Sequence, residues 1–314
     1  MRPSPAIRRL LPVLTIGALV FAACGSDDSS SDSTDAPAET EAAAATDAPA
    51  GTDAPAATEA AAPDESCAAT IDDGVLTVAT GNPAFYPYVL DDTPESGEGF
   101  ESAVAYAVAA QMGYDADSVV WVRTGFDEAI QPGAKSFDMN LQQFSIDDDR
   151  KKSIDMSLPY YTSNQAIVAL DGSPAEGATS TDDLKDVKFG AQVGTTSLAF
   201  ITDVIQPNQD PFVYDDNVAA KAALEANQID AAVFDLPTAL FVSGVEIEGS
   251  SVTGQFPADA GGTTDDFGFV LEKDAALTSC VDAAITALVN SGDLDAITTE
   301  WMSDFTGAPV ISVD

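Results

Sequence analysis

The sequence contains no histidine and only three cysteines, Cys24, Cys67 and Cys280. Histidine is the commonest general base and the commonest metal ligand, so its absence removes the usual residue for both roles. The sequence also has no Walker loop, no dinucleotide-binding glycine fingerprint, no nucleophile elbow and no cluster with metal-ligand spacing. These absences disfavour catalysis, and we expect neither a metal site nor an organic cofactor.

Positive charge is scarce as well. Twelve lysines and arginines stand against 52 acidic residues, which gives a formal net charge of −40. A chain this acidic repels nucleic acid and anionic lipid headgroups. We therefore expect no nucleic acid partner, and any membrane attachment has to come from something other than a basic patch.

The sequence has no apolar run long enough to span a bilayer comfortably, which takes about 20 residues. Its apolar run at the N-terminus, residues 10–23, follows three arginines and ends at Cys24. Its last residues, "VFAAC", resemble a bacterial lipobox. This predicts a lipoprotein signal peptide over residues 1–23 and lipidation of Cys24, whose two acyl chains anchor a protein stably. A short uncleaved anchor and an ordinary signal peptide are the alternatives.

Residues 25–65 contain eleven acidic residues, no basic residue and no aromatic residue, and they repeat "TDAPA" three times. Such a segment buries too little apolar surface to offset the entropy of ordering it. We predict that residues 24–65 comprise the lipidated cysteine and a disordered acidic tether, whose coil dimension is roughly 35 Å.

The remaining 249 residues, 66–314, exceed the usual size of a single hydrophobic core, so two lobes are expected. Export to an oxidising compartment favours a disulfide between Cys67 and Cys280. Two unrelated buried thiols are the alternative.

Runs of apolar, β-branched residues alternate with segments of helical periodicity in this part of the chain. This alternation predicts an α/β fold with mainly parallel sheets. Because the pattern restarts after residue 160, two α/β modules are expected to enclose a ligand cleft. The predicted strands cover residues 75–80, 118–123, 137–146, 165–170, 187–192, 229–235 and 266–271, and the predicted helices cover 100–114, 217–228 and a final pair divided at Ser291-Gly292.

The segment "QQFSIDDDRKKSIDMSLPYY", residues 142–161, places Arg150, Lys151 and Lys152 together in this acidic chain. It resembles the signature of the family 3 extracellular solute-binding proteins of polar amino acid ABC transporters, which include the bacterial glutamine-binding protein. The segments "LTVATGNPAFYPY", "GFESAVAYAVAAQMGY", "KFGAQVGTTS", "QIDAAVFDLP" and "LVNSGDLDAITTEWM" support the resemblance.

The resemblance implies a type II periplasmic-binding-protein-like clamshell, with two α/β lobes joined by a two-strand hinge. The first lobe would comprise residues 66–167 and 268–314, and the second lobe residues 168–267. The hinge is expected near Ala166–Val168 and Asp266–Gly268.

The resemblance also implies a ligand site. Arg150 is similar to the arginine that grips the ligand α-carboxylate, and Asp235 to the acid that meets the α-ammonium. The other implied ligand-binding residues are Gln143, Ser145, Thr196, Gln192, Phe85, Phe126 and Tyr88, the last three as aromatic walls of the side-chain pocket.

Physical chemistry supports these roles, because a buried zwitterion needs a matched partner for each charge and arginine can hold a carboxylate with two hydrogen bonds. The alternatives are a surface ion pair of Arg150 with Asp147 or Asp149, and a capping role for Asp235. Phe85 and Phe126 could equally be core residues. Gly81 and Gln192 stand where glutamine-binding relatives carry an acid and a lysine, so the ligand side chain is not predicted.

The resulting expectation is a lipid-anchored, monomeric receptor on the outer face of the bacterial cytoplasmic membrane, extracellular or periplasmic. It would capture an amino acid and deliver it to a transmembrane ABC permease. An enzyme on the same scaffold, similar to dehydratases, is the first alternative, with Glu98, Glu101 or Asp127 as its acid or base. A sensor that docks on a signalling receptor is the second.

Overall fold

The computed structural model describes residues 67–303, apart from residue 263, and residues 308–313. The expected signal peptide, the lipidation at Cys24 and the acidic tether lie outside these residues. Among the described residues, no helix is long and apolar enough to cross a membrane.

The first lobe is built on a five-stranded sheet in the order β2-β1-β3-β12-β4. Strand β1 is parallel to β2 and β3, whereas β12 is antiparallel to β3 and β4. Every residue of β1 is buried, as expected for a parallel strand covered on both faces. The strands are β1 (Leu76–Thr80), β2 (Val119–Arg123), β3 (Met139–Asn140), β4 (Asp155–Met156) and β12 (Val270–Leu271).

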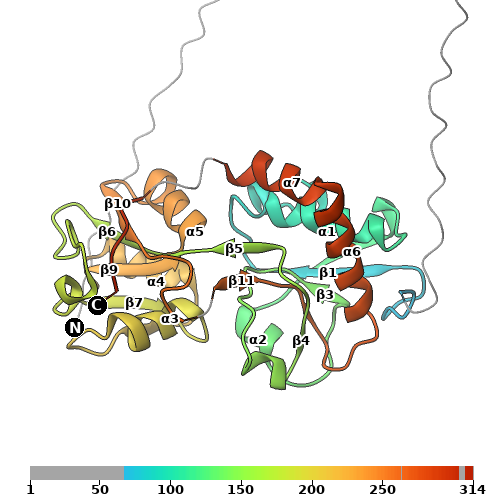
Figure 1. Ribbon diagram of the computed structural model, residues 1–314, viewed down its shortest axis with the longest axis horizontal. Coiled ribbons are helices and arrows are strands. Elements are labelled where there is room, and N and C mark those ends of the chain that lie inside the picture. The colour runs from blue at the N-terminus through green and yellow to red at the C-terminus, as the bar shows by residue number, and fades with distance from the viewer. Residues whose placement is uncertain (1–66, 263, 304–307, 314) are drawn as a thin grey trace, which may run out of the picture. The chain divides into compact units, whose positions relative to one another are not determined.

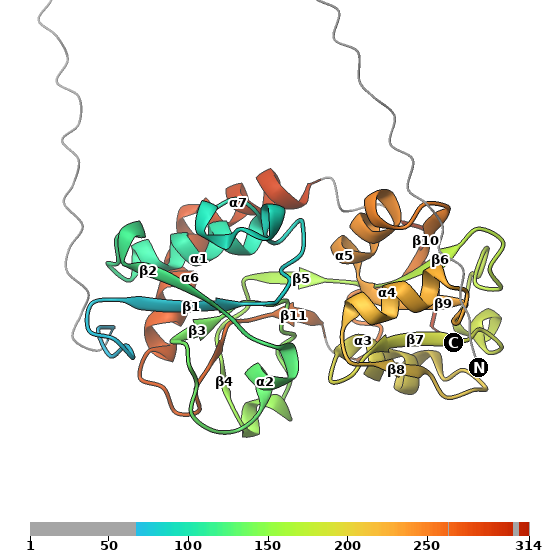
Figure 2. The same ribbon diagram turned by 180° about the vertical axis from the view of Figure 1, so that it is seen from behind.

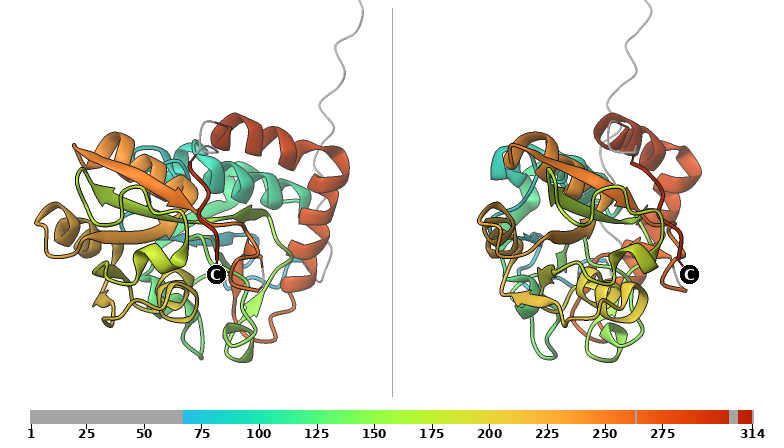
Figure 3. Two further views of the ribbon diagram at one scale, coloured as in Figure 1. Left: turned by 60° about the vertical axis from the view of Figure 1, so that its left-hand side comes forward. Right: turned by 90° about the vertical axis from the view of Figure 1, so that its left-hand side faces the viewer.

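Three helices pack together in the first lobe: α1 (Phe100–Gln111), α6 (Thr278–Ser291) and α7 (Asp293–Met302). The left view of Figure 3 shows α6 and α7, in red, beside α1. Gly292, at a φ of 83°, ends α6 with a left-handed residue, which divides the closing helices where the sequence predicted. A disulfide joins Cys67 to Cys280 and so ties the start of the described chain to α6.

The second lobe has its own five-stranded sheet, in the order β10-β6-β9-β7-β8. Strand β6 is antiparallel to both of its neighbours, and β7 is parallel to both of its neighbours. The strands are β6 (Gln165–Leu170), β7 (Phe189–Gln192), β8 (Phe212–Tyr214), β9 (Ala231–Asp235) and β10 (Ser250–Gln255), and the helices are α3 (Thr196–Phe200), α4 (Asn217–Glu225) and α5 (Leu236–Phe241).

Strands β5 (Tyr161–Ser163) and β11 (Asp265–Phe267) form a separate antiparallel pair. Figures 1 and 2 show this pair between the two five-stranded sheets. The α/β clamshell expected from the sequence is thus present, but its sheets are mixed and not mainly parallel, because each has two parallel and two antiparallel pairings. The first crossing was expected at Ala166–Val168, but these residues lie inside β6 and pair with strands on both sides. The crossing is at β5 instead.

Three other expectations need correction. The strand predicted over 137–146 shortens to β3, because the chain leaves the sheet and Gln143 adopts a left-handed φ of 50°. The strand predicted over 266–271 divides at Gly268 into β11 and β12, which belong to different sheets. Residues 308–313 were expected in the first lobe, but Val310 bridges to Gln255 and Ile311 is buried in the core of the second lobe.

A buried carboxylate holds the segment that follows β3. Glu101 on α1 is only 1% exposed. Its Oε1 accepts hydrogen bonds from the backbone N–H of Gln143 at 2.8 Å and from the Tyr160 hydroxyl at 2.5 Å, and its Oε2 accepts one from the Gln143 side-chain amide at 2.6 Å. Burial raises the pKa of Glu101 to about 7, although these donors favour the ionised form. Glu101 therefore holds Gln143 in its left-handed conformation.

We predict that ionisation of Glu101 weakens the fold between pH 5 and 8. A carboxyl group with a raised pKa binds its proton more tightly in the folded protein. Its contribution to stability is therefore complete below the unfolded pKa and is lost as the pH rises through about 7. Over this pH range, the free energy of unfolding should fall more for the parent chain than for Glu101→Gln. The difference between the two decreases should be on the order of 2 to 3 kcal/mol.

Denaturant unfolding at a series of pH values measures this difference. No histidine titrates in the same window, so the signal is not masked. Glu98→Gln, which changes an exposed carboxylate just before α1, is the matched control and should behave like the parent chain. Parallel pH profiles for all three proteins would contradict the assignment.

Candidate functional site

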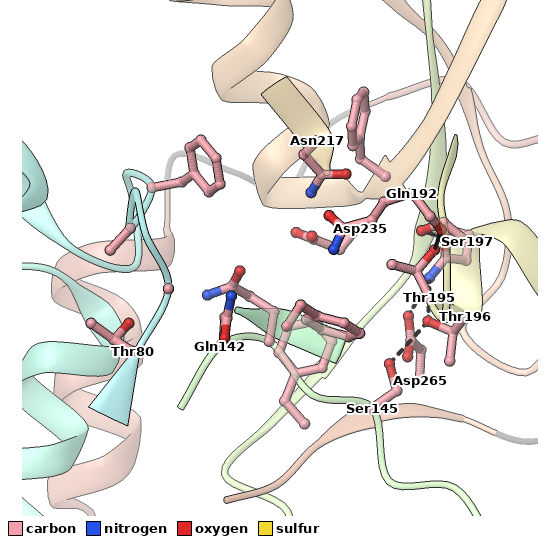
Figure 4. A pocket seen from close by; sticks show the side chains of 18 of the residues that line it. Thr80, Gln142, Ser145, Gln192, Thr195, Thr196, Ser197, Asn217, Asp235 and Asp265 are labelled. Carbon is pink, nitrogen blue, oxygen red and sulfur yellow. Dashed lines mark hydrogen bonds between the residues drawn. The ribbon is translucent and has the colours of Figure 1, made fainter. Parts of the chain in front are cut away.

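A cavity opens between the two lobes, and side chains from both lobes line it (Figure 4). Eight of the nine residues that the sequence singled out for ligand binding lie on its wall. They are Phe85, Phe126, Gln143, Ser145, Arg150, Gln192, Thr196 and Asp235. The structure thus brings together residues that are as many as 150 positions apart in the chain. Tyr88 is the exception, because it does not line the cavity.

Arg150 lies in a short helical turn, and its guanidinium is anchored by two backbone carbonyls. Nη1 donates to the carbonyl of Ser145 at 2.7 Å, and Nη2 donates to the carbonyl of Gly194, in the second lobe, at 2.8 Å. The guanidinium carbon is 5.4 Å from the ring centroid of Phe126, close enough for a cation–π contact. Burial lowers the pKa of Arg150 from its ordinary value.

The three adjacent cations Arg150, Lys151 and Lys152 differ in their partners. Lys151 pairs with Asp148 at 3.6 Å, and Lys152 pairs with Asp149. Among the described residues, no carboxylate forms an ion pair with Arg150, although its backbone N–H donates to Asp147 at 3.0 Å. The two lysines are therefore paired at the surface, whereas Arg150 brings an unpaired positive charge to the cavity.

Asp235 stands at the end of β9 and caps helix α5. Its Oδ1 accepts hydrogen bonds from the backbone N–H of Thr238 at 3.0 Å and from the Tyr88 hydroxyl at 2.5 Å. The capping role that the sequence left open is thus present, and the same carboxylate also lines the cavity. Burial raises the pKa of Asp235.

Tyr88 was expected as a third aromatic wall, and its position is different. The side chain is 0% exposed and contacts the ring of Phe267, with ring centroids 6.4 Å apart. Only its hydroxyl contacts the site, because it donates a hydrogen bond to Asp235 in the other lobe. Tyr88 therefore positions a cavity residue from behind.

A second acid, Asp265, was missed in the sequence because it was taken to precede a strand beginning at residue 266. It lies on β11 and lines the cavity. Its Oδ2 accepts a hydrogen bond from Gln165, whose own carbonyl oxygen accepts one from Ser197 at 2.7 Å. Oδ1 is buried without a hydrogen-bond partner among the described residues. Burial raises the pKa of Asp265.

Hydrogen bonds join the two lobes around the cavity. Besides the bonds of Arg150 to Gly194 and of Tyr88 to Asp235, the hydroxyls of Ser145 and Thr196 lie 3.0 Å apart. These contacts place the lobes against one another in the conformation described.

The carboxylates considered for an enzyme, Glu98, Glu101 and Asp127, do not line this cavity. The acids that do are Asp235 and Asp265. No group of three or more metal-ligating side chains occurs in the part of the chain that the structure describes. The cavity thus combines one arginine and two carboxylates with neutral polar and aromatic side chains, a composition suited to holding a small zwitterion.

Several known proteins resemble this chain. A probable histidine-binding protein of Campylobacter jejuni is 29% identical over 209 residues, which are 65% of this chain and 76% of the relative. The L-cystine-binding protein TcyJ of Escherichia coli K12 is 30% identical over 205 residues, or 65% of this chain and 73% of the relative.

The similar solved structures also include amino-acid-binding proteins. An ancestral arginine-binding protein bound to arginine superposes with a TM-score of 0.60 at 27% identity, over 73% of this chain and 98% of that one. An ancestral amino acid-binding protein described as a precursor of cyclohexadienyl dehydratase has a TM-score of 0.58 at 26% identity, over 74% and 96% of the two chains.

Residues 76–304 match the family model of the bacterial extracellular solute-binding proteins, family 3. This segment contains both sheets, the β5–β11 pair and every residue that lines the cavity. The two-lobe fold, the cavity and the amino-acid-binding relatives all agree with the match, and the chain therefore belongs to the family 3 bacterial extracellular solute-binding proteins.

Proposed function

We propose that this protein is the substrate-binding component of an ABC importer, and that it holds an amino acid in the cavity between its lobes. The observation that carries the proposal is the charge of Arg150, which is partly buried and has no ion-pair partner among the described residues, in a cavity that Asp235 also lines. The relatives named above bind amino acids with different side chains. What such ligands share is the α-carboxylate and the α-ammonium.

In this proposal Arg150 binds the α-carboxylate. One of its N–H groups is held by the carbonyl of Ser145 in the same lobe, which orients the guanidinium before a ligand arrives, and another is held by the carbonyl of Gly194 when the lobes are placed as described. A charged hydrogen bond to a carboxylate is about twice as strong as a neutral one, and an arginine can form two in parallel. The hydroxyls of Ser145 and Thr196, one from each lobe, lie on the same part of the wall and add neutral donors.

The α-ammonium is assigned to Asp235 and to the backbone carbonyl of Gln143. Asp235 lines the cavity, and Tyr88 and Thr238 fix its carboxylate through Oδ1. Glu101 fixes Gln143 through both its N–H and its side chain. Each charge of the zwitterion thus meets an opposite charge or dipole whose position is set by residues behind it, which reduces the cost of burial.

Because Arg150 and Gln143 belong to the first lobe and Asp235 to the second, one ligand contacts both lobes. Such a ligand stabilises the closed arrangement over an open one, and β5 and β11 are the segments about which the lobes would move. A dissociation constant on the order of micromolar corresponds to about −8 kcal/mol. Capture of a ligand between two lobes fits a role in transport, and we propose that the protein binds its amino acid without converting it and is not an enzyme.

We further propose that residues 1–23 are a lipoprotein signal peptide, and that lipidated Cys24 and the acidic segment to residue 65 tether a monomeric receptor to the outer face of the membrane. The lipobox-like "VFAAC" and the composition of residues 25–65 support this. A tether of this length lets the folded part reach a transmembrane permease nearby.

Substitution of Arg150 should abolish ligand binding without unfolding the protein. Titration calorimetry of the purified full chain with each of the twenty amino acids, after any carried ligand is removed, would identify the ligand. Arg150→Ala should then weaken its binding by at least about a hundredfold, because the ligand carboxylate loses its charged partner. Lys152→Ala, the matched removal of a surface-paired cation, should bind as the parent does. Unchanged affinity in Arg150→Ala would refute the site.

Substitution of Cys24 should release the protein from the membrane. In a bacterial host supplied with a labelled fatty acid, the parent chain should carry label and sediment with membranes. Cys24→Ser should do neither, and Ser26→Ala should behave as the parent does. Labelled Cys24→Ser would show that the acyl chain is elsewhere, and an unlabelled parent chain that sediments with membranes would favour an uncleaved anchor.

A further inference from the structure

The part of the cavity away from Arg150 is uncharged. We define this distal end by Thr80, Gly81, Phe85 and Gln142, which all line the cavity. In Figure 4, Thr80 and Gln142 lie on one side, Ser145, Thr196 and Asp265 lie on the other, and Asp235 and Asn217 lie between them. If the zwitterionic part of an amino acid binds at Arg150 and Asp235, its side chain points to the distal end.

The distal end offers no cation to an acidic side chain. Among the described residues, Arg150 is the one cation that lines the cavity. Arg123 donates a hydrogen bond to the carbonyl of Gly81 at 2.8 Å, but it does not line the cavity and it pairs with Asp92 at 2.6 Å. Lys221 lies behind Phe85, with its ammonium 4.5 Å from the ring centroid, and both oxygens of Glu246 accept hydrogen bonds from it at 2.7 and 2.8 Å. A carboxylate at the distal end would therefore lose its hydration without a partner, which is costly.

The distal end offers no carboxylate to a cationic side chain either. Asp235 is the proposed partner of the α-ammonium. Asp265 lies at the other end, where Gln165 binds it and where Ser145 and Arg150 lower its pKa against the effect of burial. At position 81, a Cβ atom would stand 2.8 Å from the Gln142 amide nitrogen and 3.0 Å from the carbonyl of Pro83. Glycine at this position leaves room for the Gln142 amide.

The side-chain amide of Gln142 indicates which kind of ligand group the distal end binds. Its carbonyl oxygen Oε1 is buried and has no hydrogen-bond partner among the described residues. A buried amide oxygen without a partner costs roughly 1 to 3 kcal/mol, so a ligand that donates a hydrogen bond to it gains affinity. The side-chain amide of Asn217, at the start of α4, lines the cavity between the distal end and Asp235, where it adds a donor and an acceptor.

Resting on the proposed function, we infer that the ligand is an amino acid whose side chain is uncharged and ends in a hydrogen-bond donor, such as an amide or a hydroxyl. Gln142 is the residue that determines this specificity, with Asn217 beside it. Phe85 provides an apolar surface for the methylene part of the ligand side chain.

The test is the relative affinity of the purified full chain for glutamine, asparagine, serine and threonine against arginine, lysine, glutamate, aspartate, leucine and valine, measured by titration calorimetry. The tightest of the first four should bind at least about tenfold more tightly than any of the others. A charged or aliphatic amino acid as the tightest ligand would overturn the inference and leave the proposed function standing. Failure of every amino acid to bind would overturn both.

Variants of Gln142 locate the effect. Gln142→Ala should weaken binding of the preferred ligand by about tenfold, since one buried hydrogen bond is lost. Gln142→Glu should shift the preference toward lysine or arginine, because it places a carboxylate at the distal end. Gln111→Ala, which changes an exposed glutamine on α1, is the matched control. Unchanged affinity in folded Gln142→Ala, or an unchanged preference in Gln142→Glu, would overturn the assignment.

Discussion

The account of this protein depends on one positive charge that has no ion-pair partner. Arg150 reaches the cavity in a chain of net charge −40, yet no carboxylate of the described residues pairs with its guanidinium. Two carbonyls hold it in place, and burial lowers its pKa. A charge kept partly out of water without an ion-pair partner is unfavourable unless an anion completes the site. The α-carboxylate of a ligand would supply that anion.

The rest of the structure can be understood as support for this site. The crossings at β5 and β11 allow one chain to build two sheets that face a common cavity. Residues behind the wall fix those on it: Glu101 holds Gln143 within the first lobe, and Tyr88 of the first lobe holds Asp235 of the second. The side-chain amide of Gln142 also depends on a neighbouring residue, because only a glycine at position 81 leaves room for it. Orientation before binding reduces the entropy lost when the ligand enters.

The features that could be predicted from the sequence are those that a local residue pattern or a family signature determines. The alternation of strands and helices, the division of the last helices at Gly292 and the convergence of Arg150 and Asp235 on one cavity follow from such patterns. Features set by tertiary contacts were not predictable. Asp265 reaches the cavity because β11 pairs with β5, the Tyr88 hydroxyl is useful because of a partner 147 positions away, and residues 308–313 return to the second lobe by pairing with Gln255. Periodicity carries no information on such pairings.

The most direct test of the central claim is to titrate the full chain with its tightest-binding amino acid and with the corresponding amine, which lacks only the α-carboxylate. If Arg150 is held for that carboxylate, the amine should bind at least about a hundredfold more weakly, since the buried guanidinium is then left without an anion. Equal affinities for the two compounds would show that the charge of Arg150 serves another purpose and would contradict the account.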